Sequence, residues 1–168
     1  MIVSSLKSSP YFQEYYPKVK AFQSLSFRRN EPKYPKIRKV KTYGAIIRTM
    51  IYNKMKYALV QGRHTGKWSF PKGHSNEGEE PLDCTLREVG EETGIDKLPE
   101  PTEYIQVGYG KYFVFNIERQ IPLIPRDIKE IMDTKWVTLE EMDKMSLNSD
   151  ARQYRKKLKE CEGLNVCI

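Results

Sequence analysis

The chain has no long apolar run. Its longest aliphatic stretches, Ala45-Ile46-Ile47 and Ala58-Leu59-Val60, are far shorter than the roughly 20 residues that a membrane-spanning helix needs. The sequence opens Met1-Ile2-Val3 and turns polar at once, so no signal-peptide core is recognisable. We therefore expect a cytoplasmic protein with no membrane partner.

Cysteine and histidine are also scarce. The 3 cysteines (Cys84, Cys161 and Cys167) include no Cys-x-x-Cys pair and show no zinc-binding spacing. His64 and His74 lack the helical spacing of a metal-binding histidine pair. This excludes a disulfide framework and a zinc centre from the predictions, and the thiols are expected to be buried or idle.

Positive charge is concentrated at one end of the chain. The 168 residues suit one domain, and they carry a net charge of +7. Residues 1–41 hold ten Lys or Arg against two Glu, whereas residues 42–168 are nearly neutral. A basic arm over 1–40 either attracts a polyanion, by raising its local concentration, or is a solvated tail.

Periodicity predicts an α/β protein. Alternating apolar residues predict strands over 43–47, 57–61, 68–70, 104–107, 112–117 and 136–138, with a turn near Asn53-Lys54. Helical spacing predicts helices over 81–93, 139–145 and 150–162. Strands mixed with helices in this order indicate an α/β sandwich.

The helix over 81–93 carries the clearest chemistry. Pro81 suits its first position and Gly94 its end. Glu88, Glu91 and Glu92 lie at i, i+3 and i+4, and so share one face. Such carboxylates repel one another by about 0.2–0.5 kcal/mol per exposed pair, and Mg²⁺ or Mn²⁺ would turn the repulsion into ligation. A solvated glutamate face is the alternative. The opposite face, which is expected to pack on the sheet, holds Leu82, Leu86 and Val89.

The spacing around this helix resembles the Nudix box. Gly73 is followed after five residues by Glu79 and, after seven more, by Arg87-Glu88-Val89-Gly90-Glu91-Glu92-Thr93-Gly94-Ile95. Average composition gives such a match by chance in about 10⁻⁷ of chains this long. The chain is thus identified as a member of the Nudix hydrolase superfamily. The resemblance implies a Nudix-fold α/β/α sandwich with a mixed β-sheet over 41–168 and a metal-dependent attack of water on a phosphoanhydride.

Each residue of the box has an expected role. Gly73 is expected to bend the backbone so that its carbonyl faces the metal, and Glu88 and Glu92 are expected ligands. Glu91 is either a further ligand or a base. Lys72, just before the box, is either a point charge for phosphates or an ordinary surface lysine. Structural roles fall to Glu79 and Arg87, as an ion pair, and to Gly94, as the helix end.

Two further stretches are similar to the mRNA-decapping branch of the superfamily, in its cellular catalytic subunit or its relatives in large DNA viruses. They are 60–73, which includes Trp68-Ser69-Phe70-Pro71-Lys72-Gly73, and 83–94. Lys129-Glu130-Ile131 followed by Trp136 also looks like that branch. The resemblance makes Glu130 a candidate general base, and the alternative is an ordinary helix-surface glutamate.

This resemblance implies capped RNA as substrate, with 7-methyl-GDP and 5′-monophosphate RNA as products, in the host cytoplasm if the protein is viral. The residues considered for base stacking are Trp68, Tyr43, Tyr109 and Tyr112, each with a core position as its alternative. The basic residues considered for RNA contacts are Arg28, Arg29, Lys36, Arg38, Lys39, Arg155, Lys156 and Lys157.

Two departures from the decapping branch keep other substrates open. His74 stands where that branch commonly has lysine, and residues 1–41 contain no recognisable regulatory domain. A hydrolase of diadenosine polyphosphates or diphosphoinositol polyphosphates is therefore an alternative. A non-catalytic RNA-binding protein is another, although clustered glutamates would give it no advantage beside a polyanion. No protein partner is predicted.

Overall fold

The computed structural model describes residues 42–163. Its contacts divide the chain into a unit of residues 38–156 and a unit of residues 1–37 with 157–168; the description below concerns the first unit. The basic arm over 1–40 lies outside the described residues. So do five of the basic residues considered for RNA contacts: Arg28, Arg29, Lys36, Arg38 and Lys39.

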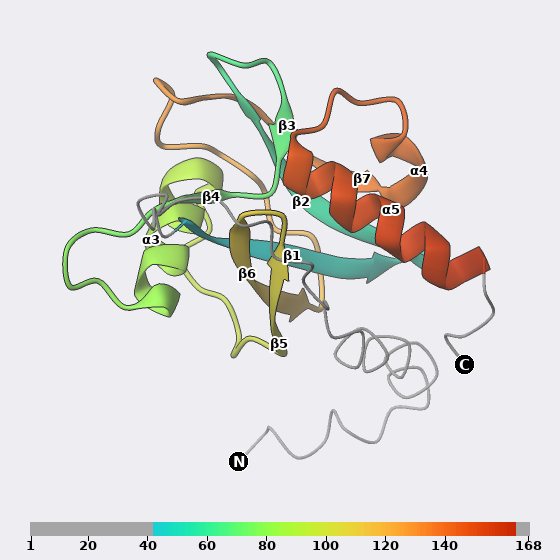
Figure 1. Cartoon of the computed structure of the whole chain (residues 1–168), viewed down its shortest axis with the longest axis horizontal. Helices are drawn as coiled ribbons and strands as arrows, with labels where there is room; N and C mark the ends of the chain where they lie inside the picture. The colour runs from blue at the N-terminus through green and yellow to red at the C-terminus, as the bar shows by residue number, and fades with distance from the viewer. Residues whose placement is uncertain (1–41, 164–168) are drawn as a thin grey trace, which may run out of the picture. The chain divides into compact units, whose positions relative to one another are not determined.

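Seven strands form one mixed sheet (Figure 1). Its main path runs β3-β2-β1-β6-β5, with β4 paired to β1 and β7 paired to β2. The pairing of β1 with β6 is parallel, and the other pairs are antiparallel. The strands are β1 (Thr42–Ile51), β2 (Lys54–Gly62), β3 (Trp68–Ser69), β4 (Lys72–His74), β5 (Glu103–Val107), β6 (Gly110–Ile117) and β7 (Ile131–Thr138).

The helix α3 (Pro81–Thr93) covers one face of the sheet. Pro81 begins it, and Gly94 ends it with φ 76° and an N–H that donates to the Gly90 carbonyl at 3.1 Å, as predicted. Val89 packs into a core cluster with Ala45 and Ile47 of β1.

One expectation for this helix is wrong. Leu86 is 39% exposed and does not pack on the sheet. The buried side of α3 includes Cys84, Thr85 and Glu92, so the helix is rolled about its axis relative to the aliphatic face that the sequence suggests. The roll brings a carboxylate, rather than Leu86, against the sheet.

The first half of α5 (Ser149–Gly163) packs on the opposite face of the sheet. Its Ala151 and Tyr154 are fully buried. The Tyr154 ring packs edge-on against Tyr57 of β2 at 6.0 Å and against Phe70 at 5.2 Å between ring centroids. With α3 and α5 on opposite faces, the predicted α/β/α sandwich with a mixed sheet is confirmed.

Short elements complete the fold. The β1–β2 turn has Tyr52 and Asn53 at φ 47° and 60°, the left-handed conformation of tight hairpins. The helix α4 (Leu139–Met142) begins with a capping box between Thr138 and Glu141. It ends three residues before the expected position, 145. Among residues 42–163, no helix has both the length and the apolarity required to cross a bilayer.

Candidate metal centre and active site

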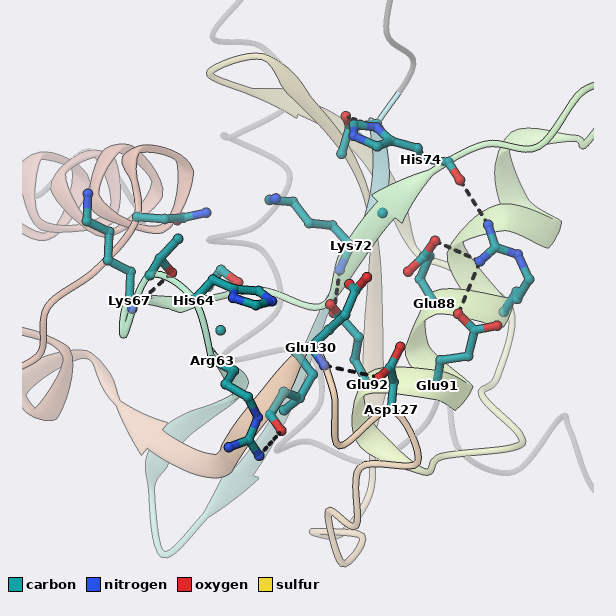
Figure 2. A pocket seen from close by; sticks show the side chains of 18 residues that line it. Arg63, His64, Lys67, Lys72, His74, Glu88, Glu91, Glu92, Asp127 and Glu130 are labelled. Atoms are coloured by element: carbon teal, nitrogen blue, oxygen red, sulfur yellow. Dashed lines mark hydrogen bonds and ion pairs between the residues drawn. The ribbon is translucent and has the colours of Figure 1, made fainter.

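An open pocket of about 660 Å³ lies between α3, the ends of β2 and β4, and the loop before β7. One wall is acidic and combines α3 with that loop: Glu88, Glu91, Glu92, Asp127 and Glu130. The facing wall carries the cations Arg63 and Lys67 and the imidazoles of His64 and His74. Figure 2 shows the two walls, with Lys72 between them. The cavity therefore has carboxylates on one side and cations on the other.

Glu92 is the most deeply placed carboxylate of the acidic wall. Its side chain sits under β4, where Oε2 accepts a hydrogen bond from the Lys72 backbone N–H at 2.8 Å, and the residue is only 8% exposed. Burial raises the pKa of Glu92 to about 8, against the opposing effect of the Lys72 amide, and the charge of Glu88 adds to the rise. No cation of the described residues forms an ion pair with it.

Glu88 lies directly against Gly73. A Cβ atom at position 73 would collide with the Glu88 carboxylate. Gly73 belongs to β4, opposite Tyr43 of β1, and is not among the positive-φ residues of the described chain. The expected reason for this glycine, a tight backbone bend, is therefore wrong: glycine is needed because a carboxylate must approach the backbone closely. Burial raises the pKa of Glu88, although Arg87 opposes the rise.

Arg87 connects the loop of the box to α3, as predicted. Its Nε and Nη2 donate to the two Glu79 oxygens at 2.8 and 3.0 Å, and Nη2 also donates to the His74 carbonyl at 2.9 Å. These bonds lower the pKa of Glu79 to about 2. The bidentate pair fixes both ends of a loop that has little regular structure of its own.

The donor set fits a hard divalent cation. Glu88, Glu91 and Glu92 supply carboxylate oxygens, the ligands that Mg²⁺ and Mn²⁺ prefer, and buried Glu92 has no cationic partner. Among the described residues no group of three or more ligand side chains is already assembled. Arg87 Nη1 forms ion pairs with Glu88 and Glu91 at 2.7 and 3.2 Å. A bound cation would compete with this guanidinium for the two carboxylates.

Glu130 comes from outside α3. It lies in the turn before β7, so the expected helix is wrong for this residue, and its role as base stays a prediction. Its side chain is exposed and lines the pocket. Its charge acts on both Glu88 and Glu92, raising the pKa of each. In Figure 2 it is drawn beside Glu92 and Lys72.

Three of the four aromatic residues considered for base stacking are core residues. Tyr112 is fully buried and its hydroxyl donates to Asp150 at 2.7 Å, so stacking on its ring is excluded. Tyr43 and Trp68 are 4% and 8% exposed, and the core alternative is confirmed for both. Tyr109 is 92% exposed in the β5–β6 turn, so its stacking role stays a prediction.

The basic residues of α5 are engaged within the protein. Arg155 forms an ion pair with Asp143 at 2.8 Å. Lys156 and Lys157 each take part in at least one hydrogen bond, ion pair or other electrostatic contact. Their proposed RNA contacts stay predictions. The two histidines are exposed, and His74 Nδ1 lies 3.2 Å from the Thr42 hydroxyl.

Asp127, Arg63 and Lys67 are among the pocket residues that sequence reasoning did not assign to the site. The spacing Asp127-x-x-Glu130 was a usable signal for a short acidic turn. Arg63 lies in the stretch 60–73 that is similar to the decapping branch, but nothing there indicated its partners, which are backbone carbonyl groups.

The comparisons with known proteins agree with this geometry. The model of the NUDIX domain family matches residues 42–158. The chain is 34% identical over 115 residues to mRNA-decapping enzyme subunit 2 of Arabidopsis thaliana, a match that covers 64% of this chain and 30% of that protein. It is 29% identical over 139 residues to RNA pyrophosphohydrolase of Bartonella quintana (strain Toulouse), covering 67% and 80%.

Solved structures show the same fold. An Ap4A hydrolase of C. elegans, in a binary complex, superposes with a TM-score of 0.56 and 22% identity, over 72% of this chain and 96% of that one. The family model spans well over half of the chain and includes the whole box with its α3 carboxylates. The chain therefore belongs to the NUDIX domain family.

Proposed function

We propose that the chain removes the 5′ cap of messenger RNA, releasing 7-methyl-GDP and leaving RNA with a 5′-monophosphate. The observation that carries the proposal is the likeness to decapping subunits, together with Glu130 at the pocket, where the sequence resembles that branch. The matched region spans only 30% of the Arabidopsis thaliana protein. The cap as substrate and the cytoplasm as the place of action therefore belong to the proposal.

The acidic wall would hold the cation. Glu88, Glu91, Glu92 and the Gly73 carbonyl are the proposed ligands, and all four residues line the pocket. A bound Mg²⁺ or Mn²⁺ neutralises phosphate oxygens and lowers the pKa of water. The buried position of Glu92 under β4 fixes one ligand, and Arg87 holds the end of β4, next to Gly73, through the His74 carbonyl.

Glu130 is the proposed general base. Water attacks a phosphorus of the cap, a new P–O bond forms, and the anhydride P–O bond on the far side breaks. The water proton passes to a Glu130 carboxylate oxygen, and the leaving phosphate keeps the electron pair of the broken bond. Lys72 extends into the pocket between the two walls (Figure 2), where its ammonium would bind a non-reacting phosphate.

A second substrate has its own supporting observation. The match to RNA pyrophosphohydrolase covers 80% of that protein's length, a much larger share than for the decapping subunit. Like capped RNA, RNA with a 5′-triphosphate has a phosphoanhydride bond at the end of an RNA chain, but it lacks the methylated base of the cap. Free diadenosine or diphosphoinositol polyphosphates stay as small-molecule alternatives.

The test is product analysis on matched RNAs. Full-length protein with Mg²⁺ or Mn²⁺ would be given one RNA sequence bearing either a labelled cap or a 5′-triphosphate, beside free dinucleoside and diphosphoinositol polyphosphates. Release of 7-methyl-GDP from the capped RNA, with a much slower rate for Glu130→Gln, is expected. Cleavage of the triphosphate or of the free compounds, with the capped RNA intact, would overturn the cap assignment.

A further inference from the structure

Glu130 stands on a short turn before β7. Residues 126–130 contain neither helix nor strand, and the Glu130 side chain is exposed. A general base must lie within hydrogen-bond reach of the attacking water. The position of Glu130 therefore depends on what fixes the backbone of this turn.

One side of the turn is attached to α3. The backbone N–H groups of Arg126 and Asp127 both donate to the Glu91 carbonyl, at 2.8 and 2.9 Å. This carbonyl lies in the last turn of α3, where a helix leaves its acceptors unsatisfied. Asp127 Oδ1 then accepts the N–H of Glu130 at 3.1 Å. The chain is thus tied to α3 just before the base.

The other side of the turn is held by Arg63. Its backbone N–H donates to the Glu130 carbonyl at 2.7 Å. Its guanidinium donates from Nε to the Ile128 carbonyl at 2.9 Å and from Nη2 to the Ile131 carbonyl at 3.4 Å. One residue therefore binds the carbonyl group of Glu130 and a carbonyl on either side of it. Figure 2 shows the Arg63 side chain turned toward this turn rather than toward the acidic carboxylates.

The local strand geometry directs Arg63 to this place. The β2–β7 pairing has a register shift between Gln61 and Gly62, where Gly62 faces Ile131. Such bulges redirect side chains beside active sites. The turn after β2 is itself fixed, because Gly62 N–H donates to the Lys67 carbonyl at 3.0 Å and Gly66 N–H to the Gly62 carbonyl at 2.8 Å. In residues 42–160 the Arg63 guanidinium forms no ion pair with a carboxylate.

We propose that Arg63 is a positioning residue, which holds the Glu130 turn across from α3 so that the Glu130 carboxylate faces the attacking water. This inference rests on the proposed role of Glu130 as the base. Arg63 acts through backbone carbonyls, so the two-pronged shape of its guanidinium matters and its charge alone does not. A lysine has one ammonium group and cannot bind two carbonyls that flank a turn in the same way.

The test is a kinetic cycle on the full-length, metal-loaded enzyme, with capped RNA or whichever phosphoanhydride substrate it is found to cleave. Arg63→Ala and Arg63→Lys are both expected to lower kcat by about 10- to 100-fold, since a small misplacement of a catalytic group has effects of this size. KM and the Mg²⁺ concentration for half-activation are expected to stay unchanged. Arg119→Ala, which removes an exposed arginine outside the pocket, is the control and should behave as the wild type.

The double variant decides between positioning and other roles. If Arg63 acts through Glu130, adding Arg63→Ala to Glu130→Gln lowers kcat no further. Multiplied losses, an Arg63→Lys variant as active as the wild type, or a change in KM alone would overturn the positioning role while leaving Glu130 as the base. A Glu130→Gln variant with wild-type kcat would instead overturn the base assignment, and the role of Arg63 with it. Melting temperatures of all variants would show that each is folded at the assay temperature.

Discussion

The two faces of the sheet each bury one glutamate to the same degree, in opposite chemical settings. Glu92, under β4 on the α3 face, and Glu103, at the start of β5 on the α5 face, are both 8% exposed. Glu103 accepts a hydrogen bond from Arg48 Nη2 at 3.0 Å, and the pair is almost fully shielded from solvent. Glu92 accepts a hydrogen bond from the Lys72 backbone N–H and forms no ion pair with a described residue. Burial by itself therefore does not distinguish a structural carboxylate from a functional one.

The difference lies in where the compensating charge comes from. A buried carboxylate is costly unless a cation and hydrogen bonds compensate it. On the α5 face the chain supplies that cation itself, and Arg48 is further held by Asn116 Oδ1 at 2.6 Å. On the α3 face no ion pair compensates Glu92; burial raises its pKa to about 8, so the carboxyl group is mostly protonated at neutral pH, and it lines the pocket. The cost of burial is thus met by an ion pair on one face and by protonation, or by the proposed cation, on the other.

The largest predicted effect is the loss of activity in Glu92→Gln without a loss of stability. Loss of this ligand is expected to lower kcat/KM by about 10³-fold, since bound cations supply several kcal/mol of stabilisation to the reaction. The free energy of unfolding without metal should not fall, because a neutral amide replaces a carboxyl group whose charged form burial already disfavours. The measurements are steady-state rates with Mg²⁺ and urea unfolding in EDTA. Exposed Glu77→Gln is the control, and an active Glu92→Gln enzyme would remove the assignment of this residue to the metal.

Glu103→Gln should behave in the opposite way. The substitution leaves the Arg48 charge buried without a carboxylate, and removal of one partner of a buried pair costs about 3 kcal/mol or more of unfolding free energy. Well below the melting temperature, kcat/KM should stay close to that of the wild type. Urea unfolding compares this variant with exposed Glu100→Gln. If stability is kept and activity is lost instead, the two faces do not differ as argued.

A smaller effect on the α5 face is expected from Tyr112→Phe. The Tyr112 hydroxyl is the donor to Asp150, which is 6% exposed, so the buried carboxylate would lose a partner at a cost of about 1–2 kcal/mol. Affinity for RNA should not change, since this ring is in the core. Thermal unfolding and RNA-binding isotherms would be measured beside Tyr109→Phe, whose exposed hydroxyl should contribute nothing to stability. Weaker RNA binding by Tyr112→Phe would restore a direct role for this tyrosine.

The sequence predicted the α3 face better than the α5 face because its determinants are close in sequence. The pair of Arg87 with Glu79, eight residues apart, and the helix end at Gly94 follow from local spacing. The Arg48–Glu103 pair joins residues 55 positions apart. It forms only because β1 runs parallel to β6 and β6 pairs with β5, and no pattern in the sequence indicates that register.

Two errors have the same physical origin. Leu86 was expected to be buried because apolar residues usually define the inner side of a helix, yet the site requires Glu92 there instead. Tyr112 was considered for stacking because an aromatic residue looks the same in sequence whether it lies in the core or at a surface. Both outcomes depend on tertiary packing. The role of Arg63 was not predicted for a related reason: every residue has a backbone carbonyl, so the sequence does not show which carbonyls an arginine will bind.

The smallest predicted effect concerns the pH dependence of metal-free stability. Glu92 has a folded-state pKa of about 8, raised by burial from its ordinary value of 4.5. The folded state therefore binds more protons than the unfolded chain between these values, and stability must fall as pH rises through this window. Because the pocket is open to water, we expect a loss of about 1 kcal/mol between pH 6 and pH 8.5, or a few degrees in melting temperature.

Melting curves in EDTA at these two pH values test this expectation, and Glu92→Gln should lose most of the difference. Mg²⁺ should stabilise the wild type more at the higher pH, because the cation competes with the proton for the same carboxylate. The Arg48–Glu103 pair provides the internal comparison, since Glu103→Gln should leave the effect of Mg²⁺ in place. An equal change of stability with pH in the wild type and in Glu92→Gln would mean that another group titrates. Glu92 and Glu103 would then differ only in that Glu103 has an ion-pair partner and Glu92 has none among the described residues.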